Sequence, residues 1–162
     1  MTNFCTILNS PLGDITIIAD ATAVNEITFS KRETSQLTSN EITQAAAEQL
    51  NAYFEGQLQT FAFPIAQTGT AFQQVVWKEL ININYGETTS YLKFSNLLNN
   101  PLAIRAIAAA NGKNHIAIVV PCHRVIGSNG KLVGYAGELW RKKWLLDHER
   151  SICGKGQTTL IF

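Results

Sequence analysis

Short runs of β-branched and aromatic residues dominate the first thirty positions of the chain. They fall at 4–8, 15–19 and 23–30, and turn-forming sequences at 11–14 and 20–22 separate them. Runs of this length bounded by turn residues are typical of strands, so we expect an antiparallel sheet. Apolar positions between 42 and 54 then recur near helical spacing after Asn40, a favoured N-cap residue. The first third therefore predicts a small sheet followed by one helix.

The pattern becomes irregular from 57 to 69, and we place a domain boundary there, with one domain at 1–66 and a second at 67–162. Helical patterns follow at 71–81, 91–98, 102–110 and 139–150, with Pro101 at the first position of the third. Two short helices joined by a tight polar break are typical of a helix-turn-helix. The apolar run 116–120 is compatible with a strand. The predicted fold class is α+β: a small antiparallel sheet domain with a helix, then a mostly helical domain containing the helix-turn-helix.

Composition favours a folded protein, with 46% hydrophobic and 15% charged residues. Residues 1–60 carry two basic and seven acidic side chains, a net −5, whereas 61–162 carry eleven and five, a net +6. A basic second part can face a polyanion, although ordinary scatter of surface charge is the simpler alternative. No apolar run approaches the roughly 20 residues of a membrane span, and the N-terminus lacks the features of a signal peptide. We expect a cytoplasmic protein.

The three cysteines are too few and too far apart for a disulfide framework or a metal site. The remaining functional hypothesis is that one of them is a reactive thiol. His123 and Arg124 directly follow Cys122, and an imidazole or cation lowers the pKa of a nearby thiol. Neighbouring residues of an extended chain point apart, so contact between Cys122 and His123 requires a turn or a bridging water. Glu149 is a candidate acceptor for the other nitrogen of His123. The alternative is a buried structural cysteine.

The stretch 103–110 is alanine-rich and carries one charge, Arg105. A helix that reads the major groove normally presents several long polar side chains. A smooth helix instead suits the minor groove, where Arg105 could fill the space left by a flipped base. A buried bundle helix with one arginine at its surface is the alternative.

Taken together, these motifs resemble the O6-alkylguanine-DNA alkyltransferases over about half of the chain. The matching segments are Gly69–Gln73, Val76–Trp77, Tyr85–Thr88, Ser90–Tyr91, Arg105–Ala106, Ala110–Gly112, Asn114, Ile118–Ile126, Gly134–Tyr135, Gly137, Leu139, Lys142, Leu145–Leu146 and His148–Glu149. The resemblance implies a ribonuclease H-like N-terminal domain and repair of O6-alkylguanine, with O4-alkylthymine as a second candidate substrate. It implies single-turnover transfer to Cys122, double-stranded DNA as partner, a monomer, no membrane association, no cofactor and no metal. Glu138 departs from the family pattern, because it stands where the second glycine of a pair is usual.

The same resemblance implies roles for individual residues. Cys122 would accept the alkyl group, His123 would act as base through a water, and Glu149 would orient His123. Tyr91 would enter the minor groove and polarise the leaving guanine, with help from Lys142. Arg105 would replace the flipped base. The remaining implied contacts are Ala103 and Ala106 to DNA, and Asn114, Val125, Tyr135 and Ala136 around the substrate base.

Three alternative hypotheses make different demands on the sequence. A lesion-binding relative without transfer activity would lack the acceptor cysteine, and Cys122 is present. A helix-turn-helix regulator should carry base-reading side chains on its second helix. A cysteine hydrolase would need an oxyanion hole, which the sequence does not reveal, and it would turn over rather than stop at one equivalent.

Overall fold

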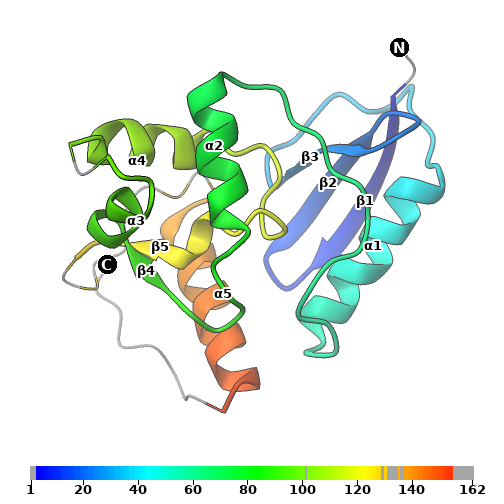
Figure 1. The fold of residues 1–162 in the computed structure, drawn as a ribbon. Helices are drawn as coiled ribbons and strands as arrows, with labels where there is room; N and C mark the ends of the chain where they lie inside the picture. Colours follow the sequence, from blue (N-terminus) through cyan, green and yellow to red (C-terminus); the bar gives the residue numbers. More distant parts are fainter. Residues whose placement is uncertain (1–2, 101, 129, 131–134, 136, 155–162) are drawn as a thin grey trace. The chain divides into compact units, whose positions relative to one another are not determined.

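The computed structural model describes residues 3–100, 102–128, 130, 135 and 137–154. They form two compact units (Figure 1). The first unit holds Met1–Thr68 together with His115–Val119, and the second holds Gly69–Asn114 and Val120–Phe162. The domain boundary predicted from the sequence instead places 115–119 in the second domain. In the described residues, no helix is long and apolar enough to cross a membrane.

The first unit is a three-stranded antiparallel sheet with one helix packed on it (Figure 1). Strands β1 (Phe4–Ser10) and β2 (Gly13–Ala19) pair from Phe4 opposite Ala19 to Ser10 opposite Gly13, and β2 also pairs with β3 (Val24–Thr28). Helix α1 (Glu41–Phe54) buries Ala46, Leu50 and Tyr53. The predicted α+β class, with its N-terminal antiparallel sheet, is confirmed.

Asn40 begins α1 as the sequence predicted. Its side-chain oxygen accepts a hydrogen bond from the Thr43 amide at 2.8 Å, and the Thr43 hydroxyl oxygen accepts one from the Asn40 amide at 3.0 Å. This reciprocal capping box satisfies two amides that a helix end would otherwise leave unpaired. The Thr43 hydroxyl also accepts a hydrogen bond from Thr6 of β1 at 2.9 Å, so the capped end of the helix is fastened to the sheet.

The segment 115–119 belongs to the first unit because it pairs with β3. Ile27 donates its amide proton to the His115 carbonyl at 2.9 Å, and Ala117 donates to the Ile27 carbonyl at 3.0 Å. The prediction of a strand at 116–120 is wrong, because the pairing of this run is limited to an isolated bridge at Ile116. Ile118 has φ of 72°, outside the β region, so the chain turns where a strand would continue.

The second unit contains four helices and a short parallel pair of strands within its described residues. Helices α2 (Ala71–Leu80) and α4 (Ile104–Gly112) pack together, and the Trp77 indole donates a hydrogen bond to the Ala110 carbonyl at 2.9 Å. Strand β4 (Thr89–Ser90) leads directly into α3 (Tyr91–Leu97) and pairs with β5 (Val125–Ile126). Helix α5 (Leu139–Ile152) completes the unit.

Helices α3 and α4 occupy the positions predicted for the helix-turn-helix, but α4 begins two residues later than expected. Ala103 is its N-cap and makes no side-chain capping bond. The predicted role of Pro101 as the first helical residue lies outside the described residues.

Glu138, which stands where the family pattern has a glycine, has a strained backbone. It is the N-cap of α5 with φ 75° and ψ 148°, a region that is essentially restricted to glycine. Its carboxylate accepts a hydrogen bond from the Trp140 indole at 2.9 Å but makes no capping bond.

Glu138→Gly should therefore raise the free energy of unfolding by about 1 kcal/mol, because relief of the strain exceeds the entropic cost of a glycine. Chemical denaturation measures this change. Glu138→Ala is the matched control, since it removes the carboxylate but keeps the β-carbon. An equal gain in both variants would show that the carboxylate, and not the backbone, is unfavourable.

Candidate active site

A turn of 3₁₀ helix, Cys122–Arg124, places Cys122, the candidate nucleophile, between Pro121 and β5. Arg124 donates its amide proton to the Pro121 carbonyl at 3.0 Å, and Cys122 donates to the Val120 carbonyl at 2.8 Å. Cys122 is only 6% exposed, and His123 is completely buried. The backbone thus forms the turn that the sequence required if Cys122 and His123 were to act together.

The Cys122 thiol has a hydrogen-bond donor in Asn114, just beyond the end of α4. The Asn114 side-chain nitrogen lies 3.3 Å from Cys122 Sγ and also donates to the Val120 carbonyl at 2.9 Å. Burial raises the pKa of the Cys122 thiol, while Asn114 and the nearby Lys142 ammonium oppose this effect. The resting cysteine is therefore a protonated thiol at neutral pH, and its proton must be removed before it can attack.

A buried ionic cluster lies beside the thiol. Glu149 of α5 contacts His123 Nε2 at 2.8 Å and receives two hydrogen bonds from Arg124, at 2.8 and 3.0 Å. The Gly86 amide donates to the same carboxylate at 3.3 Å. Burial alone would raise the pKa of Glu149, but His123 and Arg124 together hold it well below its usual range. Glu149 is consequently an anion that only accepts hydrogen bonds.

The cluster fixes the protonation of His123. Burial lowers the pKa of His123, and the Glu149 carboxylate only partly opposes this. The imidazole is therefore neutral at pH 7, and its single proton is on Nε2, because a carboxylate can only accept. His123 Nδ1 is buried and has no hydrogen-bond partner among the described residues. It is a free base next in the chain to the thiol.

Lys142 is a second buried cation in the site. Its Nζ donates a 2.6 Å hydrogen bond to the Val125 carbonyl, and the side chain has no solvent exposure. Burial lowers the pKa of Lys142 to about 8, although the nearby Cys122 raises it. The ammonium can stabilise negative charge that forms on the sulfur.

Asn111 and Tyr91 complete the group around Cys122. The Asn111 side-chain nitrogen donates to the Tyr91 hydroxyl and to the Cys122 carbonyl, both at 3.2 Å. Burial raises the pKa of Tyr91 to about 12, so its hydroxyl stays protonated at neutral pH. Burial and the nearby Cys122 likewise raise the pKa of Tyr135 well above its usual value. Among the described residues, no group of three or more His, Cys, Asp or Glu side chains is placed to hold a metal ion.

Comparison with known proteins agrees with this arrangement. Residues 71–151 match the family described as 6-O-methylguanine DNA methyltransferase, DNA binding domain, and residues 3–67 match its ribonuclease-like domain. The chain belongs to the 6-O-methylguanine DNA methyltransferase family. A methylated-DNA–protein-cysteine methyltransferase of Mycobacterium bovis is 42% identical over 89% of this chain and 90% of its own length. One of Methanosarcina acetivorans is 43% identical over 90% and 97%. A crystal structure of Mycobacterium tuberculosis OGT in complex with DNA matches with a TM-score of 0.83 and 40% identity, covering 94% of each chain.

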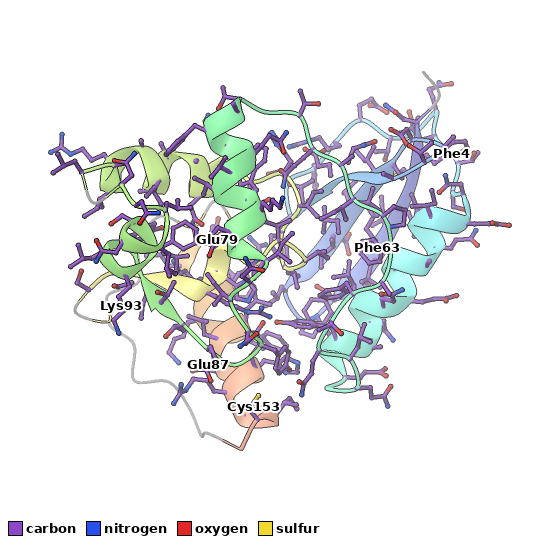
Figure 2. All side chains as sticks on the ribbon, viewed as in Figure 1. Phe4, Phe63, Glu79, Glu87, Lys93 and Cys153 are labelled. Carbon is purple, nitrogen blue, oxygen red and sulfur yellow. The ribbon has the colours of Figure 1, made fainter. Side chains whose placement is uncertain are left out.

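In this member of the methyltransferase family, the residues singled out from the sequence fall into two sets. Eight gather around the cysteine turn: Cys122, His123, Glu149, Lys142, Tyr91, Asn114, Val125 and Tyr135. Arg105 and Ala106 instead lie exposed on α4, with Ala103 at its start. Lys93 is exposed on neighbouring α3, from which it projects outward (Figure 2). Ala136 lies outside the described residues.

Sequence reasoning assigned no site role to Arg124 as a partner of Glu149, or to Asn111. Arg124 was noted only as a cation beside Cys122, whereas its guanidinium is directed to Glu149 and the Ile83 carbonyl. Asn111 belonged to a matching segment, but a polar residue near the end of an alanine-rich helix gives no sign of what it contacts. Cys153, the exposed cysteine, lies at the C-terminal end of α5 (Figure 2).

Glu149→Gln should destabilise the protein by about 3 kcal/mol, because it leaves the buried Arg124 without a compensating charge. Folding lowers the pKa of Glu149, so its contribution is complete above the ordinary carboxyl pKa of 4.5 and is lost as pH falls below it. The free energies of unfolding of Glu149→Gln and the parent protein should therefore be compared at pH 7 by urea denaturation.

Asp147→Asn on the same helix is the matched control. Asp147 pairs with Lys143 near the surface, and such pairs contribute only about 0–1 kcal/mol. Equal losses in the two variants would mean that the buried cluster is no more important for stability than a surface pair.

Proposed function

We propose that this protein repairs O6-alkylguanine in double-stranded DNA by moving the alkyl group irreversibly to Cys122. The observation that carries the proposal is a buried thiol beside a neutral histidine whose Nδ1 is free and whose Nε2 is held by an anionic carboxylate. Family membership supports it, since similar proteins are named methylated-DNA–protein-cysteine methyltransferases. The M. tuberculosis relative has been crystallised with DNA.

The chemistry needs no group beyond these side chains and water. His123 Nδ1 takes the thiol proton through a water, and the Cys122 thiolate attacks the alkyl carbon bound to O6. The sulfur–carbon bond forms, the carbon–oxygen bond breaks, and its electron pair remains on guanine, which then takes up a proton. The product is a thioether, which is a poor leaving group, so water does not regenerate the thiol. One protein molecule therefore repairs one base.

The Lys142 ammonium would stabilise the thiolate, and the Tyr91 hydroxyl would donate a hydrogen bond to the leaving guanine. Tyr135, Ala136, Asn114 and the Val125 carbonyl would surround the base. The Val125 oxygen already accepts from Lys142, so contact with a guanine amino group would use its second lone pair.

The exposed N-terminal part of α4 would approach the minor groove. Ala103 and Ala106 are small enough for close contact, and Arg105 would occupy the space of the flipped nucleotide. We propose that the protein acts as a monomer. We also propose that it acts in the cytoplasm, because a reactive thiol requires a reducing compartment.

Incubation with an oligonucleotide carrying O6-methylguanine should add one methyl group to the Cys122 peptide, with saturation at one per protein. Intact-mass spectrometry and peptide mapping measure this directly. Cys122→Ser should lose transfer completely while it retains binding to the modified duplex, because the nearby DNA-contacting side chains are unchanged. Methyl transfer by Cys122→Ser, or continued turnover beyond one equivalent, would refute the mechanism. Cys153→Ser is the control and should behave like the parent protein.

Arg105→Ala should slow repair of duplex DNA by at least about tenfold, because flipping a base costs a few kcal/mol. Reaction with free O6-benzylguanine should change little, since no base is flipped. Single-turnover rates on both substrates test this. Equal losses on the two substrates would mean that Arg105 has a structural role instead.

A further inference from the structure

Asn111 contributes its side-chain amide to two groups at the centre of the site. It is 2% exposed and lies near the C-terminal end of α4, three residues before Asn114. Its nitrogen has two protons and two acceptors, the Tyr91 hydroxyl oxygen and the Cys122 carbonyl, both at 3.2 Å. Its oxygen is buried and has no hydrogen-bond partner among the described residues.

This set of contacts fixes which way round the amide lies. If its oxygen and nitrogen were exchanged, the amide oxygen would face the Cys122 carbonyl oxygen, and no proton would lie between the two acceptors. The Cys122 carbonyl therefore requires the nitrogen at this place. The same nitrogen then reaches the Tyr91 hydroxyl, which must accept.

The direction of that hydrogen bond determines what Tyr91 can do. A phenol that accepts from Asn111 keeps its own proton for another partner. The hydroxyl has no protein acceptor among the described residues, and Tyr91 is 6% exposed. Because the pKa of Tyr91 is raised to about 12, the hydroxyl remains a donor throughout the neutral range.

We propose that Asn111 is a positioning residue that holds the Tyr91 hydroxyl with its proton directed at the leaving guanine. The proposal rests on the proposed function, since it assumes a flipped alkylguanine beside Cys122. As the carbon–oxygen bond breaks, negative charge grows on the base, and a hydrogen bond from Tyr91 stabilises it. Asn111 acts through Tyr91, and its second hydrogen bond, to the Cys122 carbonyl, fixes the amide so that the donor is held relative to the attacking sulfur.

Asn111→Leu keeps a similar volume but removes both donors. It should slow transfer from O6-methylguanine in duplex DNA by about tenfold or more, as expected when a positioned acid is lost. The rate at which iodoacetamide alkylates Cys122 at the same pH should change by less than about twofold, because iodide leaves without needing a proton. A twofold change is about the usual error of such comparisons. Both rates are measured by mass spectrometry of the Cys122 peptide.

A double-mutant cycle separates positioning from a merely structural role. In a Tyr91→Phe background, Asn111→Leu should slow transfer by less than about twofold, since the hydroxyl that it positions is absent. Asn111→Met, whose flexible side chain adapts to irregular spaces, repeats the test if the leucine variant fails to fold. Thermal unfolding shows which variants are folded.

An undiminished loss in the Tyr91→Phe background would overturn the proposal, as would an equal loss with iodoacetamide. The second result would mean that Asn111 acts on the cysteine turn alone. Failure of the proposed function has a different signature. In that case the parent protein would react with iodoacetamide but take no methyl group from the oligonucleotide.

Discussion

The buried carboxylate of Glu149 is the constraint on which the site depends. An anion removed from water must be compensated, and here His123 and Arg124 of the cysteine turn and the Gly86 amide compensate it. Arg124 extends the connection to the Ile83 carbonyl in the segment before β4. One charge therefore holds together α5, the 3₁₀ turn and the segment that leads to α3, and it sets the tautomer of His123. Compensation of the Glu149 charge thus both stabilises the fold around the site and fixes the protonation of His123.

The end of α4 supports the cysteine from another side. Asn111 holds the Cys122 carbonyl, and Asn114 holds both the thiol and the preceding carbonyl of Val120. The proposed DNA-contacting residues lie at the opposite end of the same short helix. Because a helix is stiff over this length, a shift of the end that is proposed to contact DNA would be transmitted to the thiol and to Tyr91. In the proposed function, this helix would connect DNA recognition to the reaction without a separate moving part.

Local patterns predicted the elements of this fold well. The strands, the Asn40 cap and the helices follow from short-range sequence signals, and the contact of His123 with Glu149 was anticipated from chemistry. The failures are long-range. The run 116–120 is apolar enough for a strand, yet Ile118 takes a left-handed conformation. Arg124 and Asn111 owe their roles to partners 25 and 20 residues away. No spacing rule identifies such partners, because the tertiary fold brings them together.

The raised pKa of Cys122 fits a protein that is used once. A permanently ionised thiol would react with any passing electrophile or oxidant, and each such event would consume the protein without repair. Burial keeps the resting thiol protonated. Asn114 and Lys142 are placed to stabilise a thiolate, and the unpaired Nδ1 of His123 can accept the thiol proton. Reactivity is then conditional on a substrate that fills the site and excludes water, since only then do these groups act at full strength. Burial thus favours selectivity, which matters because the thioether product is not hydrolysed and each reaction uses up one protein molecule.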